Sequence, residues 1–503
     1  MHEVKRIIKE ATVSGPGPDD ISMKLIKEGS ELLAPHLTAI FNQCFTSGTY
    51  PDAFKVAKLV PIYKGGERSK LDNYRPVSIL NALNKIMEKI VYNQMLEHIE
   101  NNNILVSQQF GFRKNLSTND AIMNFLKGIY ENNENHKYIA TFMFDLAKAI
   151  DSIDRQILLQ KLKFYGFKGT SFKLLESYLT ERKQFTNVNS KTSAVITCST
   201  GVPQGSIVGP LLFLIFFNDF VNSSPLLTFT AFADDACAWL GSDCLFELRS
   251  LAIRELREVS TWLKANKLGA NVKKTHFLIF SGRRKQDFSI RITFNSKTLE
   301  QKSSTKMLGV MIDDRLNWSD HINSVNSKIS KINGILYRLS KFLNTNTLKI
   351  IYNSLFYTQL QYGNIAWGNA AMKYLNRLIV SQKRAIRTIS HAEYLQPTND
   401  LFKSHKTLKL QDIHLLECVK FVKKELARPN TTFFVQRNNE HNMLLRNNNQ
   451  QLLNLPQPRS EQARKFVTYF GAVKWNEFPL EIRLKRTPAS FKIHAKKYLI
   501  SHY

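Results

Sequence analysis

The sequence predicts a mixed α+β fold with a helical C-terminal extension. Apolar, β-prone runs such as 138–146 and 226–240 are interspersed with helical patterns up to about residue 318. From there to about residue 424, apolar side chains recur every three or four positions, which is typical of helices. With 503 residues, 43% of them hydrophobic, the chain can bury a substantial core, and its length favours two to four domains.

The charge of the chain indicates a polyanionic partner. Lys and Arg total 70 against 41 acidic residues, a formal charge of +29, so nucleic acid is the leading candidate. An acidic membrane surface could use the same charge, but the longest apolar run, 207–217, is shorter than the ~20 residues that span a bilayer. No secretory signal opens the chain, and the cysteines lack CxxC spacing. We therefore expect an intracellular protein, in the nucleus or the cytoplasm.

Residues 1–60 read as mostly helical, with a break at 14–20. The run 57–66 predicts a short buried strand that ends in a glycine turn carrying Lys64, and Arg75 follows shortly after. Two cations beside flexible backbone could grip a triphosphate. The alternative is an ordinary solvated basic loop.

The segment QQFGFRKNLSTNDAI, 108–122, follows a helix predicted near 86–99. Its Phe110, Phe112, Arg113 and Lys114 combine stacking faces with charge, as a surface that binds a nucleic-acid strand requires. Buried aromatic side chains beside solvated charges would explain the segment almost as well.

Asp145 stands at the carboxyl end of the predicted strand 138–146. Helical spacing begins at Ile150 and continues to about residue 162. A charge at the end of an apolar strand caps the helix or binds a ligand. Asp151 and Asp154 would lie on that helix, solvated or paired with Lys148.

A hairpin is predicted within 186–198, and the segment 199–220 combines Pro203 and several glycines with a following apolar helix. Such an irregular loop would let Gln204 approach a ligand closely. The next run, 226–240, reads as a hairpin with Asp234 and Asp235 at its turn. Adjacent carboxylates near a desolvated surface repel unless cations or protons neutralise them, and such oxygen ligands suit magnesium. The alternative is a solvated surface turn.

The rest of the chain predicts a helix at 245–264, a polar turn into a strand at 268–280, and a strand pair at 306–318. The Asn-rich stretch 430–457 reads as a flexible linker. The last forty or so residues mix aromatic side chains with cations, which indicates a small basic module.

Seven motifs in order resemble the reverse transcriptase of non-LTR retrotransposons, and most closely the jockey-like LINE elements of animals. They are VPIYKGG…NYRPVSIL, QQFGFRKNLSTNDAI, FMFDLAKAIDSID, GVPQGSIVGPLLF, AFADD, NVKKTHFLIF and MLGVMIDD. The tail KWNEFPLEIR…ASFKIHAKKYL, 474–499, is similar to the ending of these elements, so the resemblance covers nearly the whole chain.

The resemblance implies a right-hand polymerase with fingers, a palm containing an antiparallel sheet, and a thumb. The corresponding parts are an N-terminal extension with fingers at 1–135, a palm at 136–318, a helical thumb at 319–429, a linker at 430–458 and a basic module at 459–503. The implied activity is RNA-directed DNA synthesis by a two-metal phosphoryl transfer.

The resemblance also assigns roles to residues. Asp145, Asp234 and Asp235 match the metal-binding aspartates, which would hold two magnesium ions, with manganese as a substitute. The other matches are Lys274 as a catalytic lysine, Lys64, Arg75, Ile150 and Gln204 at the nucleotide, and Leu308, Gly309 and Val310 at the primer. The implied partners are an RNA template, a DNA primer or target and deoxynucleoside triphosphates, with no membrane.

Two departures from the family are visible. The family reads KAFD where this chain reads KAID, so Ile150 replaces an aromatic residue expected beneath the nucleotide sugar. Nothing in the 503 residues resembles the endonuclease of these elements, so nicking would come from another protein or a missing upstream region. The main alternative is a catalytically inactive, retroelement-derived nucleic-acid-binding protein. A group II intron maturase is a second, against which the LINE-like tail argues.

Overall fold

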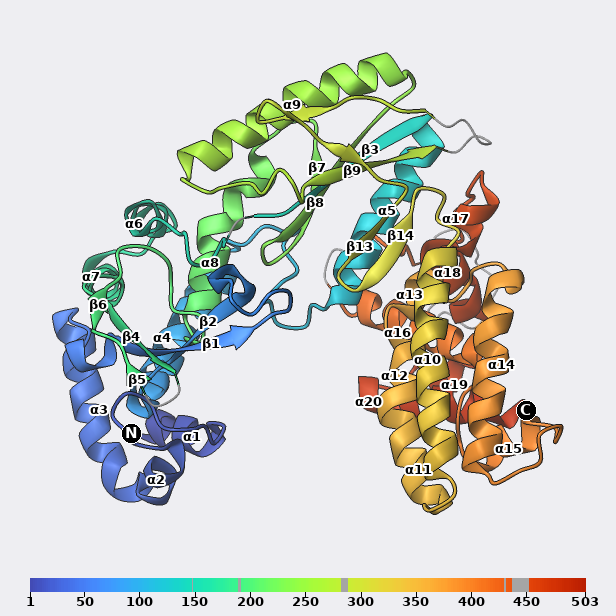
Figure 1. Ribbon diagram of the computed structural model, residues 1–503, viewed down its shortest axis with the longest axis horizontal. Coiled ribbons are helices and arrows are strands. Elements are labelled where there is room, and N and C mark those ends of the chain that lie inside the picture. Colours follow the sequence, from blue (N-terminus) through green and yellow to red (C-terminus); the bar gives the residue numbers. More distant parts are fainter. Residues whose placement is uncertain (147, 189–190, 282–287, 429–430, 437–451) are drawn as a thin grey trace, which may run out of the picture.

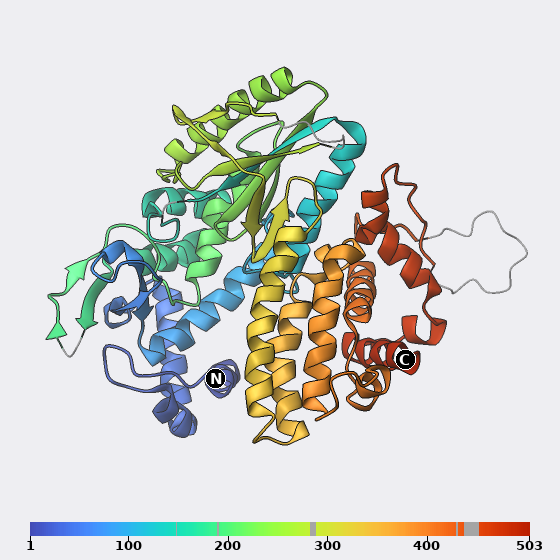
Figure 2. The same cartoon turned by 45° about the vertical axis from the view of Figure 1, so that its right-hand side comes forward.

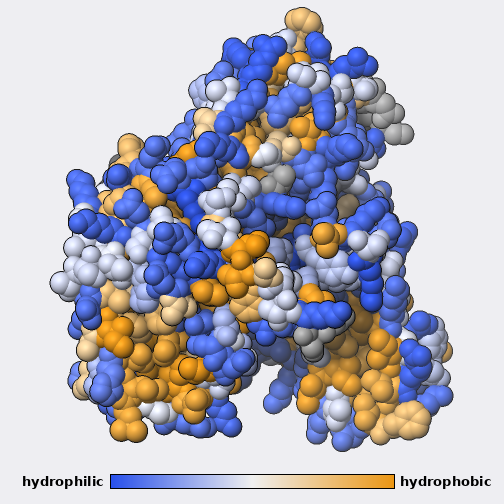
Figure 3. All heavy atoms as spheres, turned by 60° about the vertical axis from the view of Figure 1, so that its left-hand side comes forward, coloured by the Kyte–Doolittle hydropathy of each residue, from blue (hydrophilic) through white to orange (hydrophobic). Residues whose placement is uncertain are grey.

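The computed structural model describes residues 1–146, 148–188, 191–281, 288–428, 431–436 and 452–503. Its ribbon forms an arch (Figure 1), with N-terminal helices at one foot, a five-stranded sheet near the top and stacked helices at the other foot. After a turn of 45°, the last helices of the chain lie on the outer side of that stack (Figure 2). Drawn as spheres, the arch shows a hollow at its lower edge and mainly hydrophilic side chains across the middle (Figure 3). The predicted mixture of helices and sheets is confirmed.

Three helices begin the chain: α1 (His2–Glu10), α2 (Met23–Glu28) and α3 (Ser30–Ser47). The break between α1 and α2 contains Pro16 and Pro18, which disfavour a helix interior, so the predicted break is confirmed. The N-cap Ser22 accepts a hydrogen bond from the Leu25 N–H at 3.3 Å, which starts α2 after the break.

The first sheet contains β1 (Val56–Tyr63), β2 (Tyr74–Ile79), β4 (Lys183–Val188), β5 (Lys191–Thr192) and β6 (Ile196–Thr197). Antiparallel pairing of β4 with β5 and β6 confirms the predicted hairpin. The prediction that β1 is buried is wrong, since only Ala57 is buried and Ile62 is 50% exposed. The reason is that β4 pairs only with residues 56–59, so the rest of β1 has a neighbouring strand on one side.

The second sheet has the strand order β12-β9-β3-β8-β7. Its strands are β3 (Tyr138–Phe144), β7 (Thr228–Phe232), β8 (Asp235–Ser242), β9 (His276–Ser281) and β12 (Glu300–Gln301). Both faces of the middle strand β3 are buried: Ala140 and Phe142 belong to one hydrophobic core, and Ile139 and Met143 to the other. Because successive side chains point to opposite faces, a strand between two cores is mainly apolar, and in β3 only Tyr138 and Thr141 carry polar groups.

Helices cover both faces of this sheet. α5 (Thr118–Asn135) packs with the core that contains Ile139, and α9 (Leu245–Ala265) packs with the core that contains Phe142. Gly128 lets α5 approach β8, because a Cβ at this position would lie 2.2 Å from the Trp239 ring. The neighbouring helices are α4 (Ala82–Asn101), α6 (Arg155–Phe164), α7 (Gly169–Leu179) and α8 (Gly209–Phe217).

The helix predicted to begin at Ile150 begins at Arg155 instead. Asp154 is its N-cap and accepts hydrogen bonds from two backbone N–H groups of the first turn, each at 3.0 Å. Those N–H groups have no partner within the helix, so an aspartate stabilises this start. Asp154 also pairs with Lys267 at 2.6 Å and not with Lys148, which corrects that prediction.

Short hairpins and then helices complete the chain. The hairpins pair β10 (Thr293–Phe294) with β11 (Lys297–Thr298), and β13 (Ser304–Met307) with β14 (Val310–Asp313), which confirms the predicted strand pair. The helices are α10 (Ser319–Leu339), α11 (Thr345–Ile351), the π-helix η4 (Tyr352–Tyr357), α12 (Thr358–Gln361), α13 (Asn364–Trp367), α14 (Met372–Ile389), α15 (Asn399–Ser404), α16 (Leu410–Leu426), α17 (Glu461–Lys465), α18 (Val467–Glu477), α19 (Leu480–Arg483) and α20 (Pro488–Ser501).

The C-terminal helices share a hydrophobic core with α10–α16, to which Trp475 and Phe491 contribute. Asp120 of α5 binds Lys424 at 2.6 Å and Arg428 at 2.8 Å, which connects α5 to α16 and to the residues just after it. Most of the predicted Asn-rich linker, 437–451, lies outside the described residues. The bounds of the five predicted parts of the chain stay a prediction. Within the described ranges, no helix is both long and apolar enough to cross a bilayer.

Candidate active site

The hairpin of β7 and β8 brings two carboxylates to its tip. Phe232 pairs with Asp235, so the connection is a two-residue turn of Ala233 and Asp234. Ala233 is buried, whereas Asp234 and Asp235 are exposed. The predicted hairpin with both aspartates at its turn is confirmed.

Asp145 lies beside this tip, because β3 runs antiparallel to β8. Phe144, the last residue of β3, pairs with Ala236, so the next position along the chain places Asp145 next to Asp235. Although Asp235 is exposed, neighbouring atoms partly desolvate its carboxylate and raise its pKa. The negative charges of Asp234 and Asp145 raise that pKa further, while Arg75 counteracts the rise. The three carboxylates and one cation therefore share one electrostatic environment.

The polar turn at residues 271–275 is hydrogen-bonded to the backbone of Asp145. The Asn271 N–H donates to the Asp145 carbonyl at 2.8 Å, and the Asp145 N–H donates to Thr275 Oγ1 at 3.3 Å. The turn carries Lys274, whose Nζ lies 3.8 Å from Asp145 Oδ2. Asp145 therefore pairs with a cation and does not cap α6, the alternative that the sequence left open.

Gln204 lies between the first sheet and the segment that precedes α6. Its side-chain NH2 group donates to both carboxylate oxygens of Asp151 at 2.7 Å. Its backbone carbonyl accepts a hydrogen bond from the Ser78 N–H at 2.7 Å. Burial raises the pKa of Asp151, although Gln204, Lys148 and Lys64 counteract it. Asp151, which the sequence analysis placed on a helix surface, thus binds the predicted site residue Gln204.

Two glycines allow the loop that carries Gln204 to adopt its shape. Gly201 has φ +73°, and a Cβ there would lie 2.6 Å from the Asp151 carbonyl oxygen. Gly205 has φ +131°, and a Cβ there would lie 2.4 Å from the Ser78 carbonyl oxygen. The predicted tight, irregular backbone is confirmed, since neither position tolerates a side chain.

Ile150 lies in the turn before α6, next to Asp151. Its side chain is half-buried against the core, and its carbonyl accepts from the Val202 N–H at 3.2 Å. It is therefore not part of the helix face that the sequence assigned to it, although it still packs with apolar neighbours.

The predicted primer segment is the turn between β13 and β14. Leu308 and Gly309 have φ of +45° and +88°, and the Tyr362 hydroxyl donates to the Leu308 carbonyl at 2.5 Å. The Val310 side chain is fully buried, so only the first two residues present side-chain or backbone atoms at the surface. Their contact with a primer stays a prediction.

The proposed strand-binding surface at 110–114 needs correction. Phe110 is only 8% exposed, so its ring is not available for stacking. Arg113 is half-buried and donates from Nη1 to the Val106 carbonyl at 2.7 Å, and its contact with nucleic acid stays a prediction. The segment lies along β7, where the Phe110 N–H donates to the Ala231 carbonyl at 2.8 Å, and this packing buries the ring. Lys114 and Phe112 are exposed and remain available.

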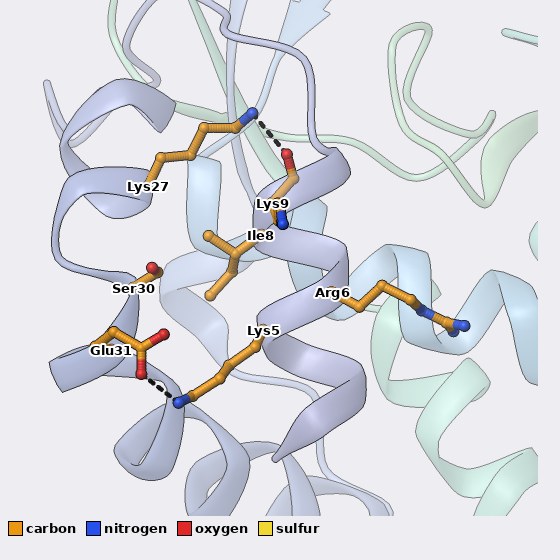
Figure 4. A pocket seen from close by; sticks show the side chains of 7 residues that line it. All are labelled: Lys5, Arg6, Ile8, Lys9, Lys27, Ser30 and Glu31. Carbon is orange, nitrogen blue, oxygen red and sulfur yellow. Dashed lines mark hydrogen bonds and ion pairs between the residues drawn. The ribbon is translucent and has the colours of Figure 1, made fainter.

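A cavity of about 340 Å³ lies among α1, α2 and α3 (Figure 4). Lys5 pairs with Glu31 across it, the Lys27 ammonium donates to the Lys9 carbonyl at 3.0 Å, and Arg6 points away. None of the predicted site residues lies on these helices, so the cavity is separate from the aspartates.

Comparisons with known proteins show what this chain is similar to. Residues 62–312, about half of the chain, match the family model of reverse transcriptase (RNA-dependent DNA polymerase). The RNA-directed DNA polymerase from mobile element jockey of Drosophila melanogaster is 26% identical over 444 residues, which cover 86% of this chain and 48% of that protein. This chain belongs to the reverse transcriptases of jockey-like non-LTR retrotransposons.

Another relative of this chain is the RNA-directed DNA polymerase from mobile element jockey of Drosophila funebris, 28% identical over 82% of this chain and 46% of that protein. The chain spans about half the length of the curated relatives that it matches. The solved structure of apo telomerase from Candida tropicalis, truncated from the C-terminal domain, overlaps 60% of this chain and 62% of its own at 12% identity and TM-score 0.38, which is too weak to carry an argument.

Reverse transcriptases generally use divalent metal ions. The carboxylates of Asp145, Asp234 and Asp235 are hard oxygen ligands of the kind that magnesium prefers, and a cation would relieve their mutual repulsion. Within the part of the chain that the structure describes, however, no three acidic, His or Cys side chains gather closely enough to hold an ion as they stand. The metal site of this reverse transcriptase therefore stays a prediction.

We expect Asp235→Asn to raise the melting temperature at pH 7.5 by about 1–2 °C. The expected change is small because the charge of a partly exposed side chain contributes only modestly to the free energy of unfolding. The raised pKa of Asp235 means that its ionisation costs folding free energy as the pH rises through that pKa. Asparagine removes this cost. The difference in melting temperature between the variant and the wild type should therefore vanish as the pH falls toward the ordinary aspartate pKa of about 3.9. Calorimetry across this pH range is the measurement. A variant that is less stable than the wild type at pH 7.5 would contradict the argument.

Proposed function

We propose that this chain is an RNA-directed DNA polymerase, which extends the 3′ end of a DNA primer on an RNA template. The observation that carries the proposal is the meeting of Asp145, Asp234 and Asp235, close enough for two of them to raise the pKa of the third. Phosphoryl transfer asks a protein mainly to position groups and to stabilise charge. Carboxylates converging from β3 and the β7–β8 turn are suited to that task.

The architecture is that of a right-hand polymerase. In this proposal the first sheet and the N-terminal helices form the fingers, the second sheet is the palm, and α10–α16 form the thumb. The formal charge of +29 supports binding of an RNA template, a DNA primer and deoxynucleoside triphosphates. Contacts to the phosphate backbone would let one surface accept any template sequence.

The chain's own residues divide the work of the reaction. Asp145, Asp234 and Asp235 would hold two magnesium ions, which would supply positive charge to the phosphoryl transfer. Lys64 and Arg75 bind the triphosphate of the incoming nucleotide, and both already act electrostatically on carboxylates of the site. The Lys274 ammonium protonates the leaving pyrophosphate.

A primer-extension assay tests the proposal. A DNA primer annealed to an RNA template is incubated with the chain, magnesium and deoxynucleoside triphosphates, and manganese replaces magnesium in a parallel reaction. We expect template-directed extension with magnesium. Tight binding of the primer–template without extension under either metal would instead identify a catalytically inactive nucleic-acid-binding protein.

Ile150→Phe should improve selection of deoxynucleotides over ribonucleotides by ~10–200-fold. This is the range of discrimination expected when a side chain that lines a substrate pocket changes by a few carbon atoms. In the family, the residue at this position lies beneath the sugar, and a ring would collide with a 2′ hydroxyl where isoleucine leaves more room. The measurement is the ratio of kcat/KM for one matched pair of nucleotides.

The matched control for Ile150→Phe is Ile157→Phe, at another half-buried isoleucine of the same core, on α6. It adds the same ring outside the turn beside Asp151, so the selection ratio should stay within about threefold of the wild type. If Ile150→Phe also leaves the ratio within threefold, Ile150 belongs to the core and not to the nucleotide pocket.

A further inference from the structure

Gln109 holds the turn that carries the two adjacent aspartates. Its side chain is 3% exposed, and its Oε1 accepts hydrogen bonds from the Ala233 N–H at 2.9 Å and the Gly111 N–H at 2.8 Å. Its Nε2 donates to the Ala233 carbonyl at 3.3 Å. One buried amide therefore binds both the N–H and the carbonyl of the residue before Asp234.

The turn needs such support. Ala233 has φ +56° at the first position of a two-residue hairpin turn, where glycine is preferred when φ is positive. A side chain in this left-handed region is strained, so the conformation persists only when its surroundings impose it. The adjacent carboxylates add repulsion at the same tip, since the negative charge of Asp234 raises the pKa of Asp235.

The segment that supplies Gln109 is itself fastened along β7, the last strand of the second sheet. The Phe110 N–H donates to the Ala231 carbonyl at 2.8 Å, and the Ala231 N–H donates to the Gln108 carbonyl at 2.9 Å. Gly111 passes so close that a Cβ there would lie 2.2 Å from the Ala233 nitrogen. The backbone therefore delivers the Gln109 amide to one fixed place.

We propose that Gln109 is a positioning residue, which fixes the Ala233 peptide groups and thereby orients Asp234 and Asp235 toward Asp145. Its catalytic consequence rests on the proposed polymerase function, whereas its effect on the turn does not. Without Gln109 the hairpin still forms through the β7–β8 ladder, but its tip samples other conformations. A displacement of about 1 Å at reacting groups can cost ~10²-fold in rate.

The test is Gln109→Met, which keeps the length of the side chain and removes its three hydrogen bonds. Hydrogen–deuterium exchange is followed in a peptide spanning residues 230–236, where we expect the turn amides to exchange at least about tenfold faster. In primer extension we expect kcat to fall by about 10–100-fold, with KM for the nucleotide and affinity for RNA within about threefold. Unchanged exchange, or faster exchange with unchanged kcat, would overturn the proposal.

Two further variants sharpen the result. Gln108→Met is the matched control, because this neighbouring side chain accepts a hydrogen bond from Ser107 and not from the turn, so exchange and kcat should match the wild type. The second variant adds Ala233→Gly to Gln109→Met. Glycine relieves the strain of the positive φ at position 233, so this double variant should recover part of the kcat lost in Gln109→Met. A merely structural role of Gln109 would not predict this recovery.

If Gln109→Met does not fold, Gln109→Asn replaces it, since an amide one methylene shorter cannot reach both groups of Ala233, and the same outcomes apply. If the wild type itself does not extend a primer, the proposed function fails, and the exchange measurement alone decides whether Gln109 holds the turn. The two failures are therefore distinguishable.

Discussion

Asp234→Asn should lower the rate of primer extension by ~10³-fold or more, while affinity for the RNA template stays within about threefold. Asn keeps the size of Asp and its place in the turn but removes the negative charge that a cation needs. Single-turnover extension measures the chemical step, and a separate binding titration measures affinity for the template.

The control is Asp243→Asn, an exposed aspartate just beyond the opposite end of the same hairpin, whose carboxylate accepts from the Lys137 N–H at 3.1 Å. It removes the same charge away from Asp145 and should leave extension within about threefold of the wild type. Extension that survives Asp234→Asn would show that the centre lies elsewhere.

Affinity for a primer–template duplex should fall by roughly 10³–10⁵-fold between 50 and 200 mM salt if about 6–10 phosphates are contacted. The reason is the excess of cations, formally 29, which would release counterions from the nucleic acid on binding. Fluorescence anisotropy at a series of salt concentrations gives the slope. A flat profile would contradict a predominantly electrostatic interface.

The exposed Lys114 offers a residue-level version of this experiment. If it contacts one phosphate, Lys114→Gln should reduce the slope of log affinity against log salt by about 0.7–0.9, whereas Lys114→Arg, which keeps the charge, should leave the slope unchanged. Equal slopes for all three proteins would remove Lys114 from the interface.

The sequence by itself determined the elements that carry the carboxylates. The apolar run ending at Asp145 and the hairpin turning at Asp234 are both present in the structure. The physical reason is local: a strand that is buried on both faces is mainly apolar, so charged side chains are found where such a strand ends. Glycine and proline likewise marked the loop that holds Gln204, because few other residues accept its backbone conformation.

Only the tertiary structure decided which residues support those carboxylates. Gln109 binds Ala233 across 124 positions of sequence, and Gln204 binds Asp151 across 53. The same packing buried Phe110, which the sequence had assigned to a nucleic-acid surface. Local patterns report the periodicity of one segment and not the partner that covers it, since side-chain hydrogen bonds between distant segments depend on how the whole chain packs.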